Sequence, residues 1–203
     1  MKLLIKAENI WLENSRSVVF KNVRTEIKKG DFVWIEGAGA SGKSLLMRTL
    51  AKKIKPSKGK LLSYTKTPLC APDGSLLENE SVKNNIREML RRRKENDTAF
   101  IMTELMKSMD LFDVRNIAAG KLSDSQRQLL NLSTFLVLET EALLFDDPLA
   151  ALDNEHRILF IAAAEKKRNR GTAIVISSTL PCPAACPAGA RHILLKDGKL
   201  SEE

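Results

Sequence analysis

The chain has 203 residues, of which 43% are hydrophobic and 29% are charged. That length suits one well-packed domain, or a core domain with a small subdomain, and leaves little room for two independent domains. The net charge of +8 at pH 7 is compatible both with plain solvation and with an anionic partner. No run of about twenty apolar residues and no amino-terminal signal pattern is present, so we expect a cytoplasmic protein without a membrane span.

The amino-terminal third is typical of β structure. Apolar clusters interrupted by Asn, Ser and a Lys-Lys-Gly turn predict short antiparallel strands over residues 3–27. The unbroken apolar run 32–35 predicts a strand buried on both faces. After a glycine-rich loop, apolar spacing over residues 44–54 predicts a helix, and a short strand is expected at residues 60–65.

The remainder of the chain alternates between helix and strand patterns. Apolar stripes in a polar, helix-like segment from residue 82 to about 120 predict an inserted helical lobe, whose core contains Met102, Met106 and Met109. Beyond the lobe, the sequence predicts helices at 126–138 and 155–168, strands at 142–145 and 172–177, and a closing hairpin turn at 196–199. This alternation indicates an α/β fold with helices on both faces of the sheet.

The loop between the strand at 32–35 and the following helix contains the complete pattern G-x-x-x-x-G-K-[ST]. Glycines let the backbone approach phosphate oxygens, so that N–H groups and the helix N-terminus face the charge, and the lysine adds a cation. A glycine-rich turn that matches by accident is the alternative, but the flanking strand and helix argue against it. The pattern therefore predicts binding of a nucleoside triphosphate, ATP with Mg²⁺, by Gly37, Ala38, Gly39, Ala40, Ser41, Gly42, Lys43, Ser44 and Leu45.

A second pattern supports this site. The apolar run 143–145 predicts a buried strand that ends in Asp146 and Asp147. In P-loop proteins a carboxylate at such a strand end holds Mg²⁺, and the Ser44 hydroxyl offers another hard oxygen ligand. A plain turn before Pro148 is the structural alternative, but a full phosphate loop about a hundred residues upstream favours a metal site at Ser44 and Asp146.

The segment before the helix that leads to the acidic strand reads Leu-Ser-Asp-Ser-Gln-Arg-Gln. It resembles the signature Leu-Ser-Gly-Gly-Gln of the nucleotide-binding domain of ATP-binding cassette (ABC) proteins. Residues 151–153, Ala-Leu-Asp, resemble the loop through which two such domains touch. The signature-like residues are Ser123, Asp124, Ser125 and Gln126.

The resemblance spans nearly the whole chain and implies one ABC-type ATP-binding domain over residues 1–203. Its P-loop NTPase core is RecA-like, with a mostly parallel sheet flanked by helices and an antiparallel β subdomain, and is expected at residues 1–81 and 128–203. The inserted helical subdomain is expected at about 82–127.

Several positions depart from the family's pattern. Asp147 stands where the family has the catalytic Glu that polarises the attacking water, and its side chain is about 1.5 Å shorter. Ser178 replaces a histidine that contacts the γ-phosphate, and Asp73 replaces a glutamine. Asn14 stands in place of the aromatic residue that stacks on adenine, so Trp11 either substitutes for it or belongs to the core.

The signature is altered as well. Asp124 and Ser125 replace two glycines, and a carboxylate there would bring negative charge close to phosphate. Together with the changes at the other positions, this predicts slow or absent hydrolysis, with Asp147 as the catalytic residue.

The resemblance further implies partners. We expect a homodimer, or a heterodimer with another ABC ATPase, that binds a transmembrane transporter subunit at the cytoplasmic face of the membrane and does not bind nucleic acid. Two alternatives stay open: a regulatory or assembly protein that uses ATP binding as a switch, and the degenerate half of a heterodimeric ABC ATPase.

Three further features indicate structure rather than chemistry. The basic run at residues 91–94 is expected on an exposed helix face, because no aromatic residues are interleaved with it. Cys182 and Cys186 are expected as free thiols, since two sulfurs fall short of a zinc site. We expect no grouping of acid and nucleophile around His156.

Overall fold

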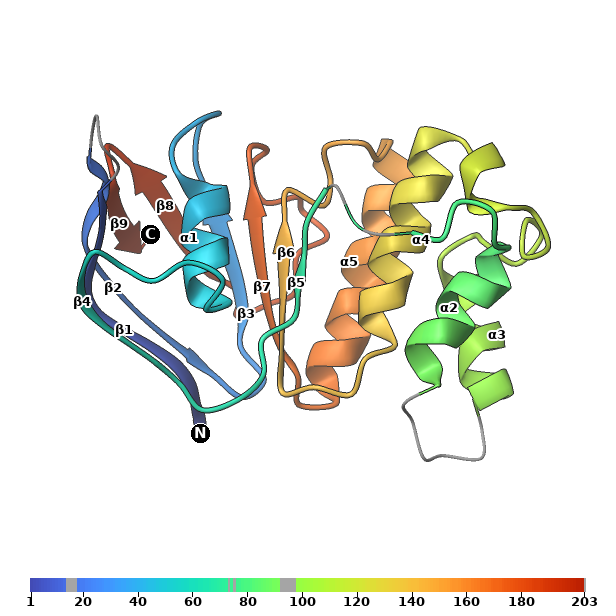
Figure 1. The fold of residues 1–203 in the computed structure, drawn as a ribbon, viewed down its shortest axis with the longest axis horizontal. Helices are drawn as coiled ribbons and strands as arrows, with labels where there is room; N and C mark the ends of the chain where they lie inside the picture. The colour runs from blue at the N-terminus through green and yellow to red at the C-terminus, as the bar shows by residue number, and fades with distance from the viewer. Residues whose placement is uncertain (14–17, 73, 75, 92–97, 203) are drawn as a thin grey trace.

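The computed structural model describes residues 1–203 apart from 14–17, 73, 75, 92–97 and 203 (Figure 1). The described elements, in chain order, are β1 (Leu3–Glu13), β2 (Val18–Lys28), β3 (Phe32–Glu36), α1 (Lys43–Leu50), β4 (Lys58–Ser63), β5 (Leu69–Cys70), α2 (Val82–Leu90), α3 (Thr98–Ser108), the 3-10 helix η1 (Ala119–Lys121), α4 (Asp124–Leu136), β6 (Ala142–Asp146), α5 (Asn154–Asn169), β7 (Ala173–Ser178), β8 (Arg191–Lys196) and β9 (Lys199–Glu202).

A six-stranded sheet with the order β5-β6-β7-β3-β8-β9 forms the centre of the molecule. Neighbouring strands are parallel except β8 and β9, which form the predicted closing hairpin. Side chains of β3 alternate between two apolar cores: Phe32 and Trp34 belong to one, Val33 and Ile35 to the other. Because β3 is buried on both faces, its sequence is an unbroken apolar run. The predicted α/β fold class is confirmed.

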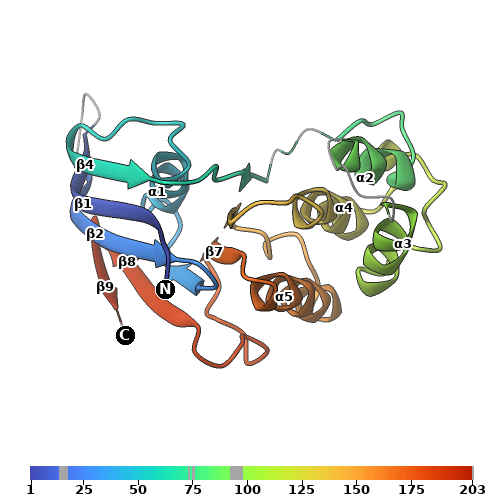
Figure 2. The same ribbon diagram turned by 90° about the horizontal axis from the view of Figure 1, so that it is seen from below.

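Different layers cover the two faces of this sheet (Figures 1 and 2). The face that carries Phe32 and Trp34 packs against α4 and α5, and α2 and α3 lie against them in turn. The opposite face packs against α1 and the three-stranded antiparallel sheet, whose order is β2-β1-β4. As a result, α1 and α4 lie on opposite sides of the central sheet.

The opening segment is antiparallel, as predicted, but its strands are long. β1 and β2 each run for 11 residues. Asn9 and Asn22 adopt φ angles of 50° and 52°, and the pairing register shifts between Ala7 and Ile10. Such bulges let a strand continue through polar residues that otherwise resemble breaks. The prediction of short strands over residues 3–27 is therefore wrong.

Helix ends differ from the predictions because side-chain caps and a backbone turn set them. α4 begins two residues earlier than expected, since Ser123 accepts a hydrogen bond from the Gln126 amide and Gln126 bonds back to the Ser123 amide, both at 3.3 Å. α5 begins after Asp153, which accepts the amide of His156 at 2.9 Å. α1 ends at Leu50, earlier than predicted, in a turn where Lys52 takes a φ of 58°.

The loop between β7 and β8 contains a disulfide between Cys182 and Cys186, so the prediction of free thiols is wrong. Their Cα atoms lie 6.5 Å apart, within the range that a disulfide spans. The loop turns back on itself, with the Cys186 amide donating to the Pro183 carbonyl at 2.9 Å. That reversal brings the two sulfurs together, and the spacing in the sequence does not reveal it.

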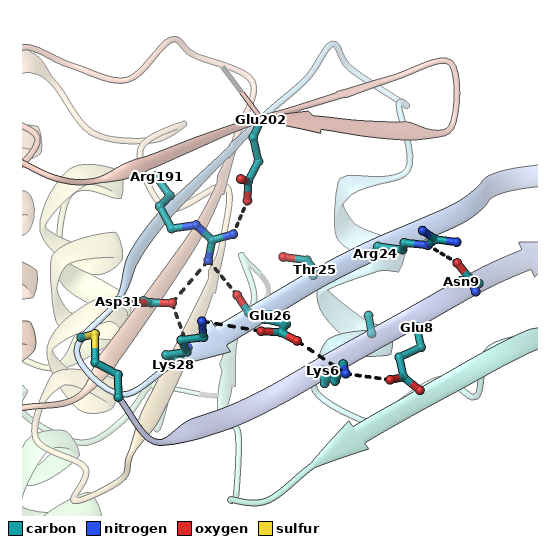
Figure 3. A pocket seen from close by; sticks show the side chains of 12 residues that line it. Lys6, Glu8, Asn9, Arg24, Thr25, Glu26, Lys28, Asp31, Arg191 and Glu202 are labelled. Atoms are coloured by element: carbon teal, nitrogen blue, oxygen red, sulfur yellow. Dashed lines mark hydrogen bonds and ion pairs between the residues drawn. The ribbon is translucent and has the colours of Figure 1, made fainter.

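A charged hollow of about 910 Å³ is lined by residues of β1, β2 and the β8–β9 hairpin (Figure 3). The Arg191 guanidinium reaches from β8 toward β2, where it donates to the Glu26 carbonyl oxygen at 2.7 Å and to the Asp31 carboxylate at 3.3 Å. It also forms an ion pair with Glu202. At the other end of β2, the Lys21 amide donates to the carbonyl of the β8–β9 turn at 2.7 Å. Hydrogen bonds near both ends of β2 thus connect the antiparallel sheet to the central sheet.

Candidate nucleotide-binding site

The loop between β3 and α1 places residues 37–44 at the carboxyl end of the central sheet. Gly37 has no room for a side chain, since a Cβ atom there would lie 2.7 Å from the Leu195 carbonyl oxygen. Gly42 has a φ of 98°, and an added Cβ would lie 2.9 Å from Val19. Both positions therefore require glycine. The loop leads directly into the amino end of α1, whose free N–H groups favour an anion.

Lys43 is the first residue of α1, and its ammonium group lies over the loop. Nζ donates to the carbonyl oxygens of Gly37 and Ala38, at 2.7 and 2.8 Å. Burial lowers the pKa of Lys43 from its ordinary value, and the charges of Asp147 and Asp146 partly offset this effect. The loop thus holds a partly desolvated cation close to two carboxylates.

Ser44, Asp146 and Ser177 form a connected polar group at the ends of α1, β6 and β7. The Ser44 hydroxyl donates to Asp146 Oδ1 at 3.1 Å, and the Ser177 hydroxyl donates to the same oxygen at 2.7 Å. Asp146 and Ser177 are direct partners in the parallel pairing of β6 with β7. The Asp146 side chain is therefore buried but hydrogen-bonded, and its orientation is fixed toward the phosphate loop.

The donor set at this point fits Mg²⁺. Ser44 and Asp146 supply a hydroxyl and a carboxylate oxygen, the hard ligands that Mg²⁺ prefers, and this ion normally keeps several waters. Within the described ranges, no cluster of three or more His, Cys, Asp or Glu side chains could hold a metal. Two protein oxygens leave the other coordination positions of such an ion open to water or other oxygen ligands.

Asp147 lies one residue beyond β6 and has a φ of 46°. Its amide donates to the Ser177 carbonyl at 2.9 Å, and its carboxylate accepts from the Thr179 amide and hydroxyl, each at 3.3 Å. The carboxylate is therefore held at the carboxyl end of β7. Ser177 and Thr179 were not among the predicted site residues, although a run of three hydroxyl residues at the end of a buried strand is a signal that could have indicated them.

Ser178, which stands in the place of the family's histidine, is fully buried at the end of β7. Its hydroxyl accepts the Leu180 amide at 2.9 Å, and its carbonyl accepts the Gly37 amide at 3.2 Å. The backbone of Ser178 therefore joins β7 to the phosphate loop, while the hydroxyl is engaged within its own turn.

The signature-like segment lies apart from the phosphate loop. Ser123 and Gln126 cap α4, and the Ser125 hydroxyl lies 2.8 Å from His156 Nδ1, so the expectation that His156 lacks such neighbours is wrong. Because α4 and α1 pack on opposite faces of the sheet, one chain does not bring Asp124 and the phosphate loop together (Figure 1).

Trp11 is partly exposed on β1, with the Lys58 ammonium 5.2 Å from the ring centroid. Trp11 belongs to neither apolar core, whereas Trp34 on β3 is fully buried. The reading of Trp11 as a core residue is therefore wrong. Asn14, Asp73 and residues 92–94 of the basic run lie outside the described residues.

These features define a class of protein. A buried strand, a glycine-rich loop that carries Lys43 and Ser44, and a carboxylate at the end of a nearby parallel strand are the parts of a P-loop nucleoside triphosphatase. Residues 20–150 match the family model described as ABC transporter. The chain belongs to the ABC transporter family.

Two curated relatives are named as import ATP-binding proteins. The aliphatic sulfonates import ATP-binding protein SsuB 1 of Burkholderia cenocepacia is 30% identical over 191 residues, which cover 90% of this chain and 58% of that protein. The spermidine/putrescine import ATP-binding protein PotA of Spiroplasma citri is 28% identical, over 98% of this chain and 61% of that protein. The chain thus spans less than two thirds of the length of these relatives.

Solved structures of cassette proteins share the fold. The ATP-binding subunit of an ABC transporter superposes with a TM-score of 0.85 at 15% identity, covering 98% of this chain and 89% of that chain. A dimeric ATP-binding cassette with bound ADP and phosphate gives 0.82 at 21% identity, covering 98% of each chain. Within the described part of this chain, no helix is long and apolar enough to cross a bilayer.

Proposed function

We propose that this chain is the ATP-binding subunit of an ABC-type transporter, which binds ATP with Mg²⁺ and works beside a transmembrane partner. The observation that carries the proposal is the hydrogen bond between Ser44 and Asp146, next to the cation of Lys43. Relatives that are named as import ATP-binding proteins support the choice of transport over other cassette roles.

In this proposal each group acts on a different part of the nucleotide. The loop amides and Lys43 bind the phosphates, because both direct positive charge toward the amino end of α1. Ser44 and Asp146 would hold Mg²⁺, which would neutralise part of the phosphate charge. Trp11, a partly exposed aromatic residue on β1, is proposed as the residue that contacts the base.

Hydrolysis is proposed to be slow or absent. Asp147 has a short side chain, and its carboxylate is already engaged by Thr179. The Ser178 hydroxyl is engaged by the Leu180 amide and carries no charge. Since a misplacement of about 1 Å can reduce a rate about a hundredfold, these two groups are poorly arranged to activate water.

The proposal includes a dimer. The signature-like residues lie on the opposite side of the sheet from the loop, so a complete site needs a second ABC domain, identical or different. We further propose a location at the cytoplasmic face of a membrane, with residues 82–127 as the surface for a transmembrane subunit. Nucleic acid is not proposed as a partner.

Two other functions remain as alternatives. Strong ATP binding with no turnover, even with a transmembrane partner present, would favour a regulatory or assembly switch, and the engaged Asp147 fits that reading. ATP hydrolysis that appears only when a second, different ABC domain is present would favour the degenerate half of a heterodimer. The carboxylate of Asp124, in place of a signature glycine, fits that alternative.

Calorimetric titration with MgATP, alongside a turnover assay, tests the proposal. We expect saturable binding, turnover below the ~1–10³ s⁻¹ of typical enzymes, and a loss of at least about tenfold in affinity for Lys43→Ala. Lys53→Ala, an exposed lysine just beyond α1, is the matched control and should bind like the wild type. Absence of binding to the wild type would refute the proposal.

A further inference from the structure

His156 lies in the first turn of α5, where three segments of the chain meet. Its Nδ1 atom is 2.8 Å from the Ser125 hydroxyl at the amino end of α4 and 2.7 Å from a carboxylate oxygen of Asp153, the N-cap of α5. Its Nε2 atom is 3.7 Å from the Asp110 carboxylate, in the turn after α3. The imidazole is mostly buried, with 17% of the side chain exposed.

This grouping of Ser, His and Asp is not a nucleophile triad. In a triad the hydroxyl and the carboxylate bind different ring nitrogens, so that a proton can pass from one side of the ring to the other. Here Ser125 and Asp153 both reach Nδ1. Since an ionised carboxylate can only accept, Nδ1 carries the proton and donates to both oxygens. This geometry suits positioning of the Ser125 and Asp153 side chains rather than transfer of a proton between them.

The groups that His156 holds belong to the two segments expected to meet a partner domain. Ser125 is in the signature-like segment, and Asp153 ends the segment 151–153. Asp153 also accepts the His156 amide at 2.9 Å, so the ring and the helix cap share one carboxylate. The hydrogen bond from the His156 amide, and to a smaller extent the one from its ring, lowers the pKa of Asp153 and keeps the carboxylate ionised as an acceptor.

We propose that His156 is a positioning residue that couples the signature-like segment to residues 151–153, so that both present one pre-formed surface to the nucleotide of a partner domain. Where glycines would leave the start of α4 free, Ser125 is anchored through the ring to α5. Only the expected effect of this link on association with a partner domain rests on the proposed function. The link itself is a property of the single chain.

Hydrogen exchange tests the link without any nucleotide. The amides of Gln126 and Arg127 bond to Ser123 and report on the first turn of α4. In His156→Asn the amide nitrogen of the new side chain takes the place of Nδ1, whereas in His156→Gln it takes the place of Nε2.

We expect His156→Gln and Ser125→Ala each to speed exchange at these amides about fivefold to tenfold, as loss of a hydrogen bond to a partly buried group implies. The double variant should show no further increase, and His156→Asn should stay within about twofold of the wild type. Unchanged exchange in β3 and β7 would show that the fold is intact. The link would be overturned if exchange became faster only in α5. It would also be overturned if His156→Asn sped exchange at Gln126 and Arg127 as much as His156→Gln.

A second measurement tests the consequence. We expect His156→Gln to bind MgATP like the wild type in calorimetry, because α5 and α1 pack on opposite faces of the sheet. Its MgATP-induced association, followed by sedimentation, should weaken about fivefold to tenfold. Equal association of the two proteins would overturn the positioning role. A wild type that binds no MgATP would refute the proposed function instead, and hydrogen exchange would still decide the link.

Discussion

The Ser44 hydroxyl and the Asp146 carboxylate are 102 positions apart in the sequence and meet through a hydrogen bond of 3.1 Å. The sheet order makes this contact possible. β3, which leads into the phosphate loop, and β6, which ends at Asp146, are separated only by β7, and all three end at the same edge. The Ser177 hydroxyl, contributed by the intervening strand, fixes the same carboxylate oxygen.

The first prediction concerns this pair. Asp146→Asn keeps the size of the side chain but removes the charge that would hold Mg²⁺. We expect MgATP affinity to fall at least about tenfold, while the weaker binding of ATP in the presence of a chelator stays nearly unchanged. Asp197→Asn is the control, since the β8–β9 turn accepts Asn as readily as Asp. Equal losses with and without Mg²⁺ would contradict a metal role for Asp146.

The second prediction concerns the reach of Asp147. Asp147→Glu adds one methylene and should bring the carboxylate closer to an attacking water. We expect turnover to rise about tenfold and still remain below ~1 s⁻¹, because Ser178 and Asp124 are unchanged. Asp197→Glu, made at an exposed turn, controls for the added methylene. A steady-state phosphate-release assay checks this, and a fully active wild type would contradict it.

The third prediction concerns pH. Lys43 is charged below its pKa, and burial lowers that pKa, so the cation is lost at a lower pH than for an exposed lysine. MgATP affinity should therefore fall as the pH rises from about 8 toward about 10, near the ordinary pKa of lysine. Titrations across this range should show the decline in the wild type and none in Lys43→Ala. A parallel decline in both proteins would assign it to another group.

The fourth prediction concerns the thiols. Cys70 is buried, and burial together with the nearby charge of Asp146 raises its pKa, so little reactive thiolate forms. We expect the oxidised native protein to react very slowly with a maleimide and to expose Cys182 and Cys186 after treatment with a reductant. Mass spectrometry of the labelled peptides distinguishes the sites. Rapid labelling of Cys182 before reduction would contradict the disulfide.

The phosphate loop and the α/β class follow from local sequence patterns alone. The loop is a continuous stretch between a strand and a helix, so its glycines, Lys43 and Ser44 act through backbone geometry that neighbouring residues specify. The alternation of buried strands and helices follows in the same way from local periodicity. Departures at Asp147 and Asp124 were also visible in the sequence, since they are changes of residue type at recognisable positions.

The contacts between distant side chains depend on how the elements pack in three dimensions. Thr179 engages Asp147 and Ser177 engages Asp146 because β6 and β7 are neighbours in register, and no local pattern encodes that adjacency. His156 reaches Ser125 because α4 and α5 pack together, although their sequences are separated by β6. Local periodicity fixes an element and its buried face, whereas the pairing of elements depends on packing across the whole sheet.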